Sequence, residues 1–177
     1  MPLRELVLKP VQADLEENGC ILEDGERIIT FRAKTFQTLV EKLECMTGPI
    51  VAKTLLYQLG NQLGRTAISY SKLRLLESGE NLVQMYDNVL RFRGWGRCLA
   101  IDPTDRGYRV TIQNCALCHM QKANEACCDL MRGGVVGWIE AFLGVRAAAS
   151  VETECVATGG KFCVFEITLP QESLSTK

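Results

Sequence analysis

Two cysteines separated by a pair of glycines place the strongest constraint on how this chain can fold. Cys155 and Cys163 flank Gly159 and Gly160, and glycine accepts the positive φ angle that a tight reversal requires. The segment is therefore expected to fold back and to bring the two thiols together. Glu152 lies three residues before Cys155, where a regular strand would direct the two side chains to opposite faces. If both serve one site, the strand must bend near Cys155.

A fourth ligand for such a site would have to come from another part of the chain. Cys127 and Cys128 stand at or near the start of the preceding predicted helix, where the helix dipole and the free N–H groups of the first turn favour thiolates. Three thiolates and one carboxylate suit zinc in number and softness. Reduced cysteine is also among the most commonly buried side chains. Spacing alone leaves both a zinc site and plain buried thiols open.

A second group of candidate ligands precedes that helix. Cys115, Cys118 and His119 formally match the attachment pattern of c-type haem, but this attachment requires export and the first residues lack an apolar signal core. The same residues, with Cys127, could hold a second metal or an iron–sulfur cluster. A pair of reduced thiols in a loop is the plainer interpretation, since short cysteine motifs often match by chance.

The residues around these cysteines resemble a known family. The matching strings are Glu152-Thr153-Glu154-Cys155, Cys163-Val164-Phe165 and Cys128-Asp129-Leu130-Met131-Arg132-Gly133. They are similar to the 4-vinyl reductase domain, which also forms the sensor half of phenol- and xylene-responsive bacterial transcription activators. The resemblance covers about residues 96 to 169 and, more loosely, about residues 22 to 66.

The resemblance implies a zinc site and a fold. In the aromatic sensors zinc is held by a cysteine that opens the long helix, a glutamate and two further cysteines, which correspond here to Cys128, Glu152, Cys155 and Cys163. The family also implies an α+β fold shared with subunits of a vesicle-tethering complex, an apolar cavity between helices and sheet, and frequent dimers. This chain departs from the sensors in its extra cysteine pair before the helix, in a helix-to-strand connection that is one residue longer, and in lacking their upstream histidine. Phenol specificity is therefore not expected.

The resemblance implies a single α+β domain in which an antiparallel sheet of about four strands packs against a layer of helices, and the apolar periodicity predicts where the individual elements lie. We expect an N-terminal arm over residues 1–17, the ligand-binding domain over 18–170 and a disordered tail over 171–177. A hairpin is predicted over 19–31 because Asp24-Gly25 is a strong reversal signal. Helices are predicted over 35–47, 50–63, 79–90 and 124–143, and strands over 97–101, 108–113 and 161–169, with a further strand after 146–151.

The glycines and aromatic residues suggest where two helices contact each other and where a ligand could bind. Glycine costs a helix up to about 1 kcal/mol relative to alanine, so the glycines of the long helix require either tight backbone packing or space for a ligand. Close packing against another helix is the favoured explanation. Two glycines spaced four residues apart on the predicted 50–63 helix could form the surface that faces the long helix. The candidate pocket residues are Tyr57, Trp95, Trp138 and Phe142, although aromatic residues on helices pack more often in a core.

Composition narrows the classes of function. The net charge of −1 gives no basic surface for nucleic acid, and no apolar run is long enough to span a membrane. Nine cysteines without an export signal indicate a reduced, cytoplasmic protein. The single histidine leaves no Ser/His/Asp set, and phosphate-loop and dinucleotide motifs are missing, so no catalytic residue is assigned.

The resemblance to this family, taken with the extra cysteines, implies three possible functions. The first is a module with structural zinc that binds a hydrophobic or tetrapyrrole-like small molecule and acts as a carrier, sensor or assembly factor. The second is a redox or accessory protein of (bacterio)chlorophyll or tetrapyrrole metabolism or photosystem assembly, with an iron–sulfur cluster on the extra cysteines. The third is an architectural subunit. A homodimer or a partner protein is expected.

Overall fold

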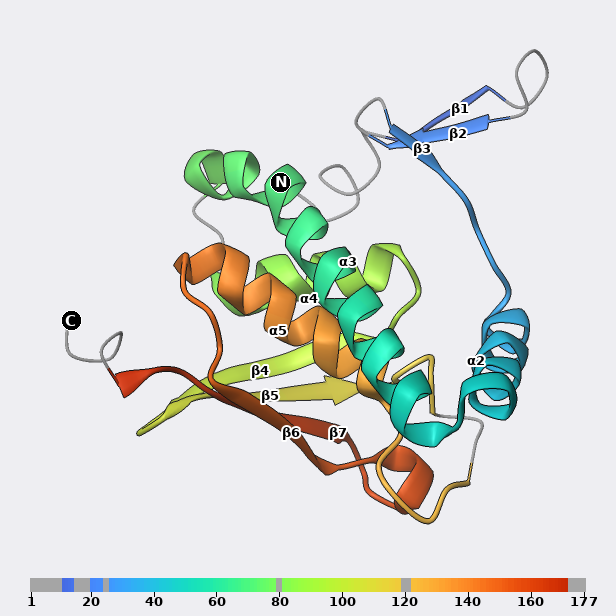
Figure 1. Cartoon of the computed structure of the whole chain (residues 1–177). Coiled ribbons are helices and arrows are strands. Elements are labelled where there is room, and N and C mark those ends of the chain that lie inside the picture. Colours follow the sequence, from blue (N-terminus) through green and yellow to red (C-terminus); the bar gives the residue numbers. More distant parts are fainter. Residues whose placement is uncertain (1–10, 15–19, 24–25, 79–80, 119–121, 172–177) are drawn as a thin grey trace.

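The computed structural model of the chain describes residues 11–14, 20–23, 26–78, 81–118 and 122–171 (Figure 1). Its helices are α2 (Ala33–Thr47), α3 (Pro49–Ser78), α4 (Leu82–Phe92) and α5 (Asp129–Leu143). A large sheet contains β4 (Arg97–Thr104), β5 (Gly107–Gln113), β6 (Ala149–Glu154) and β7 (Cys163–Thr168), with the short 3-10 helix η1 (Val156–Thr158) between β6 and β7. A small sheet contains β1 (Val11–Asp14), β2 (Cys20–Glu23) and β3 (Glu26–Ile28).

The large sheet supports the helices on one face. Its strands are antiparallel in the order β4-β5-β7-β6, and α3, α4 and α5 lie to one side of it (Figure 1). Alternate residues of β5 and β7 are buried, among them Val110, Ile112, Phe165 and Ile167. They belong to the same apolar core as the buried side chains of α5, including Trp138. The predicted α+β fold is therefore confirmed.

Helices α3 and α5 cross with their backbones in contact. A methyl group on Gly60 would overlap the backbone oxygen of Leu130, and one on Gly137 would overlap that of Asn61. Gly64 and Gly133 are equally restricted by the opposite helix. Close backbone packing, rather than space for a ligand, thus explains these glycines.

Two predicted helix boundaries are wrong for physical reasons. The predicted 50–63 helix continues to Ser78, because Gly64 is a contact glycine and does not end the helix. The long helix begins at Asp129 and not near Asn124. Cys128 is its N-cap residue, and the carbonyl of Cys128 accepts the first helical hydrogen bond from Arg132 N. The segment before it is tied instead to η1, through Ala123 N–H and the carbonyl of Ala157 at 2.9 Å.

The N-terminal part forms a small sheet of its own. Strands β2 and β3 pair antiparallel, which confirms the predicted hairpin, while its turn at 24–25 lies outside the described residues. The strand β1 pairs with β2, so residues 11–14 of the predicted arm form a strand of this sheet. Figure 1 shows the small sheet standing apart from the helices, connected through an extended segment. Nearly all of the predicted tail also lies outside the described residues, and the domain boundaries stay a prediction.

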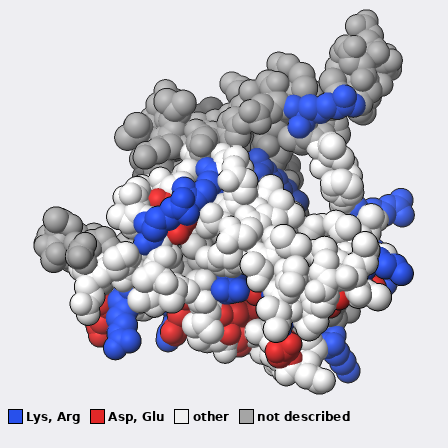
Figure 2. Space-filling view, viewed as in Figure 1, with Lys and Arg blue, Asp and Glu red and all other residues white. Residues whose placement is uncertain are grey.

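An apolar stripe lies on the surface of α3. Helix α3 exposes Val51, Leu55, Leu59 and Leu63, which are spaced four residues apart and form what we call the α3 stripe. Figure 2 shows acidic and basic side chains interspersed on one face, around a broad uncharged area where α3 lies. Within the described residues, every helix is too short or too polar to cross a bilayer.

Candidate metal centre and adjoining pocket

Five buried cysteines from four segments meet beside the start of α5. The Sγ atom of Cys128 lies 3.7 Å from that of Cys115 and 3.8 Å from those of Cys155 and Cys163. The Sγ atom of Cys118 lies 3.3 Å from that of Cys163. Two of these residues follow β5, one precedes α5, one follows β6 and one opens β7. The centre therefore joins the helical layer to both ends of the β6–β7 reversal.

A local irregularity places Glu152 and Cys155 in the same site. The register of β6 against β7 shifts between Glu152 and Glu154, which supplies the predicted bend. The chain then reverses at Gly159, whose φ of 97° lies in the left-handed region. Both backbone N–H groups that follow the glycines, those of Lys161 and Phe162, donate to the carboxylate of Glu154. The segment from Glu152 to Cys163 thus folds back as expected.

The two carboxylate oxygens of Glu152 differ in their hydrogen bonding. Its Oε2 accepts a hydrogen bond from Cys128 N–H at 2.9 Å, whereas its buried Oε1 has no partner among the described residues. Burial raises the pKa of Glu152 to about 8. A buried carboxylate oxygen without a donor is costly. A cation among the thiolates would compensate it, so this residue fits a metal centre.

The thiols also influence one another. Hydrogen bonding with neighbouring thiols, first with Cys118, lowers the pKa of Cys155. The corresponding interactions, first with Cys115, raise the pKa of Cys128. Such opposite shifts follow from crowding several ionisable groups into one buried site, because like charges cannot all ionise without a counterion.

Among the described residues, two sets of four side chains have the spacing of a metal site. The first comprises the predicted zinc ligands, and the second replaces two of them with the extra cysteine pair; in each set the ligand atoms all lie within 4.8 Å of one another. Tetrahedral zinc with bonds of about 2.3 Å to sulfur separates its thiolates by about 3.8 Å. An iron–sulfur cluster distributes its four thiolates over two or four irons, so thiolates on different irons lie farther apart than thiolates on one zinc ion. The sets are Cys128, Glu152, Cys155, Cys163 and Cys115, Cys118, Cys128, Cys163.

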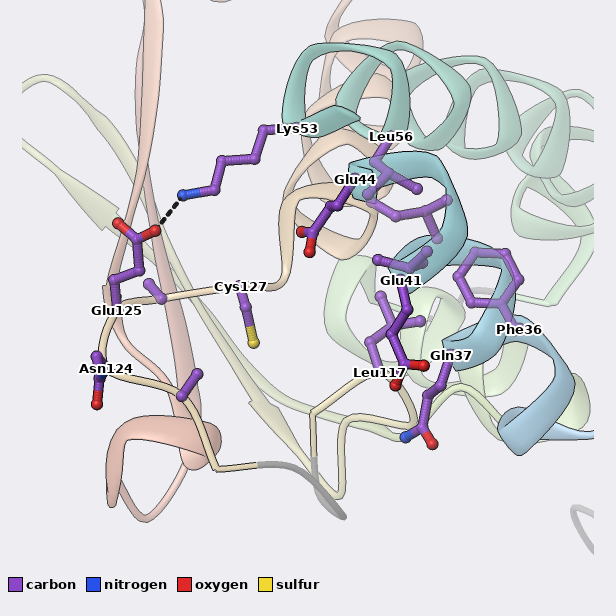
Figure 3. A pocket seen from close by; sticks show the side chains of 14 residues that line it. Phe36, Gln37, Glu41, Glu44, Lys53, Leu56, Leu117, Asn124, Glu125 and Cys127 are labelled. Carbon is purple, nitrogen blue, oxygen red and sulfur yellow. Dashed lines mark hydrogen bonds and ion pairs between the residues drawn. The ribbon is translucent and has the colours of Figure 1, made fainter. Parts of the chain in front are cut away.

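The predicted second group does not form a separate centre. Cys115 and Cys118 join the first group, because β5 and β7 pair with Ile112 opposite Cys163 and so bring the end of β5 to that cysteine. Cys127 belongs to neither set and is half-buried at the adjoining pocket (Figure 3). His119 lies outside the described residues. Spacing along the chain gave no signal for this convergence, which depends on strand pairing.

A pocket adjoins the centre between α2, α3 and the segment before α5. Its volume is about 310 Å³, and its apolar walls include Phe36, Leu56, Leu117 and Leu130. Gln37 is only 7% exposed, and its Nε2 lacks a hydrogen-bond partner in the described part of the chain. Figure 3 shows Gln37 near Leu117 and Phe36.

The pocket also has a charged margin. Lys53 and Glu125 form an ion pair at 2.7 Å on one side (Figure 3). The exposed carboxylates of Glu41 and Glu44 come from α2. The pocket therefore combines apolar walls, one buried amide donor and an acidic edge.

The four predicted pocket residues occupy other positions. Trp138 is 0% exposed and lies in the core beside Tyr86 and Phe142. The ring of Tyr57 lies under the Arg132 guanidinium, 4.6 Å from its centroid. Trp95 contacts the ring of Phe36 edge-on. None of the four lines the pocket described above.

Solved structures with a similar fold come from three kinds of protein. The phenol-responsive sensory domain of the transcription activator PoxR, crystallised with phenol, has a TM-score of 0.78 at 17% identity and covers 97% of this chain and 92% of its own. A vinyl-4-reductase family protein from Methanocaldococcus jannaschii has a TM-score of 0.56 at 18% identity, with 81% of this chain and 85% of its own covered.

The third structure is a trafficking protein particle complex subunit 3 from Naegleria fowleri, covalently bound to palmitic acid. Its TM-score is 0.55 at 15% identity, and the match covers 78% of this chain and 93% of that one. These similarities agree with the relationships expected from the sequence, and at such identities they establish a shared fold. No protein-family model and no curated protein matches the sequence.

Proposed function

We propose that this chain is a sensor or carrier domain that binds a compact, mostly apolar small molecule beside a closed structural zinc site. The observation that carries the proposal is the buried amide of Gln37, which lacks a partner in the described residues and lines a pocket with apolar walls and a charged margin. Buried polar groups are normally hydrogen-bonded, so this donor fits a ligand that brings an acceptor. The similar fold of a sensory domain crystallised with phenol supports a binding role.

The pocket favours a particular class of ligand. A volume of about 310 Å³ is at the lower end of ligand pockets, which favours a compact molecule over a tetrapyrrole. Phe36, Leu117 and Leu130 would contact its apolar body, and Gln37 would donate to an oxygen or nitrogen acceptor. The carboxylates of Glu41 and Glu44 disfavour an acidic ligand through charge repulsion. The expected ligand is therefore neutral or cationic.

Zinc is the metal that best fits the centre. Four ligands drawn from thiolates and one carboxylate give a closed site, which is the arrangement of structural rather than catalytic zinc. When bound, zinc would cross-link the start of α5 to the β6–β7 reversal. The residues that would hold it are Cys128, Glu152, Cys155 and Cys163. Thiolates of this kind require a reducing compartment, so we assign the protein to the cytoplasm.

An iron–sulfur redox protein of tetrapyrrole metabolism is the second candidate. Its support is the presence of five buried thiols in one site, which exceeds the four ligands that zinc takes. The short sulfur–sulfur distances favour a single ion instead. Elemental analysis and a visible spectrum of protein purified without air separate the two. About one zinc per chain without colour supports our proposal, and iron with absorbance bleached by dithionite supports the redox candidate.

The binding proposal is tested with phenol as the first probe, followed by neutral and cationic aromatic compounds of similar size. Trp95 contacts Phe36 at the pocket wall, so its fluorescence is expected to change on binding. Leu117→Trp should fill the pocket and abolish the change. Leu39→Trp, on the exposed side of the same helix as Gln37, is the matched control. If no member of the series binds the wild type, or if Leu117→Trp binds equally well, the proposed pocket is wrong.

We further propose that two copies of the chain associate through the α3 stripe. Its members repeat every four residues along one side of α3 and expose about half of each side chain. A two-fold contact places the same apolar surface on both partners and buries it from water. A homodimer would thus cover an apolar surface that the single chain leaves exposed.

A further inference from the structure

The metal centre offers more ligands than one ion can bind. Six side chains present a thiol or carboxylate, and the two sets that satisfy metal-site spacing share Cys128 and Cys163. Zinc accepts four protein ligands in a closed site. We propose that one ion occupies either set, exchanging the pair Glu152 and Cys155 for the pair Cys115 and Cys118, and that occupancy of the pocket selects between them. This rests on the metal site and pocket proposed above.

The shared residues are placed to remain bound during such an exchange. The Sγ atoms of Cys128 and Cys163 lie 3.8 Å apart, as expected for two thiolates on one tetrahedral ion. Cys115 is 3.7 Å from Cys128 and Cys118 is 3.3 Å from Cys163, so the extra pair already touches both shared thiolates. Cys155 is 3.8 Å from Cys128. Neither pair has to travel far to bind.

The exchange is also balanced in charge and geometry. Cys115 and Cys118 each release a proton when they bind the ion, and Glu152 and Cys155 take up those two protons when they leave it, so the net charge of the buried centre does not change. Zinc has no geometric preference from its d electrons, and both sets allow four-coordination. Glu152 is not lost from the fold when it leaves the ion, because its Oε2 retains the hydrogen bond from Cys128 N–H.

The pocket and the exchanging pair share one short segment. Leu117 lines the pocket, and it stands between Cys115 and Cys118 in the chain. Cys127 likewise lines the pocket next to the shared ligand Cys128. A molecule in the pocket that displaces Leu117 would therefore displace the thiols of both Cys115 and Cys118. Filling the pocket should disfavour the four-cysteine set, and metal in that set should in turn weaken ligand binding, because coupling between sites is reciprocal.

The test replaces zinc with cadmium-113 and records its NMR spectrum in the whole chain. Each added thiolate moves the cadmium resonance to higher frequency, so the two sets give distinct positions. Cys115→Ser/Cys118→Ser should report the carboxylate set, and Glu152→Gln/Cys155→Ser should report the four-cysteine set, each with one ion per chain. The wild type is expected to show two resonances, or one between the two reference positions.

Three further variants sharpen the result. Cys128→Ser removes a shared ligand and should lower cadmium affinity by more than about 100-fold, the upper end of what loss of a supporting contact costs a metal site. Leu117→Trp should move the wild-type signal towards the carboxylate position, whereas Leu39→Trp should leave it unchanged. The wild type, Leu117→Trp and Leu39→Trp keep all six candidate ligands, and a shift to lower frequency reports the loss of thiolates, so this comparison remains valid even if a double variant fails to fold.

The outcomes that overturn the exchange are specific. A wild-type resonance that stays at one reference position with and without Leu117→Trp would show a single fixed set. Two cadmium ions per chain would show separate sites. In both cases the proposed structural metal site would survive while the exchange would not. A wild type that binds no metal, by contrast, would remove the proposed centre itself.

Discussion

The carboxylate of Glu152, at the end of β6, accepts a hydrogen bond from the backbone N–H of Cys128, the N-cap of α5, at 2.9 Å. This contact fixes one oxygen of Glu152 and leaves the other facing the thiols without a partner among the described residues. It joins the sheet to the helix through a residue that is also a candidate metal ligand. A substitution at Glu152 can test its role as a metal ligand while it preserves this hydrogen bond.

Glu152→Gln keeps an oxygen for the Cys128 N–H but removes the anionic ligand. We expect zinc affinity to fall at least about tenfold, which lowers the free energy of unfolding by about 1.4 kcal/mol when zinc is saturating. Competition with a chromophoric chelator and thermal melting measure the two effects. Glu166→Gln is the control, because Glu166 forms an exposed ion pair with Arg109 away from the centre. Equal zinc affinity in both variants would exclude Glu152 as a ligand.

Neighbouring glycines on α5 should respond in opposite directions to alanine. Gly137→Ala forces a methyl group into the backbone of Asn61 and should cost about 1–3 kcal/mol in the free energy of unfolding. Gly134→Ala places its methyl group 3.7 Å from the nearest atom, an ordinary contact, and should gain up to about 1 kcal/mol from helix propensity. Urea denaturation of both variants decides the matter. If both are destabilised alike, the helices do not cross as described.

The buried carboxylate of Glu140 should make stability depend on pH. Burial alone would raise its pKa, but hydrogen bonds from Ala147 N–H, Asn61 and Arg65 outweigh this and lower the pKa below its usual value. A lowered pKa stabilises the fold above the unfolded value and loses that contribution as the pH falls through the folded value.

Glu140→Gln tests this dependence. It should cost about 1–3 kcal/mol in the free energy of unfolding at pH 7, and the difference from the wild type should shrink as the pH falls below about 4. Chemical denaturation across pH provides the measurement. A difference that stays constant over this range would show that ionisation of Glu140 does not contribute.

Self-association should depend on the α3 stripe. Leu59→Glu places a charge in the middle of this surface, where desolvating it on association is costly. Sedimentation velocity at increasing concentration should show a dimer for the wild type and a monomer for the variant. Leu99→Glu, at another exposed leucine on β4, is the matched control and should remain dimeric. A wild type that stays monomeric would contradict the proposed contact.

Local patterns in the sequence predicted the strands of the large sheet and the reversal between Cys155 and Cys163, whereas the family resemblance supplied the ligand set with Cys128 and Glu152. The alternation of Val110 and Ile112 identified β5, and the glycines between Cys155 and Cys163 identified the reversal, because both signals lie within a few residues. That a metal binds there remains a prediction. The role of the extra cysteine pair was missed, since it depends on the pairing of β5 with β7, strands separated by α5 and β6.

The pocket was equally inaccessible to sequence reasoning. Gln37 is a polar residue on an amphipathic helix, and nothing in its neighbours indicates burial. It becomes buried only because α2 packs near a segment eighty residues later in the chain, around Leu117. The four aromatic residues predicted to line a pocket were selected because ligand pockets are often lined by aromatic rings. Trp138, however, is fully buried in the hydrophobic core. The position of the pocket thus depends on contacts between segments distant in the chain, which local periodicity does not encode.

The interlocking of α3 and α5 has a mechanical consequence. Because backbone meets backbone at four glycines, neither helix can slide or roll without a steric clash, and the pair must move as a single rigid unit. Cys128 stands at one end of this unit, and Leu59 stands on its outer surface. A displacement of Cys128 would therefore shift the outward face of α3 as well. A change of ligand at the buried metal centre could in this way alter the surface that α3 presents to a binding partner.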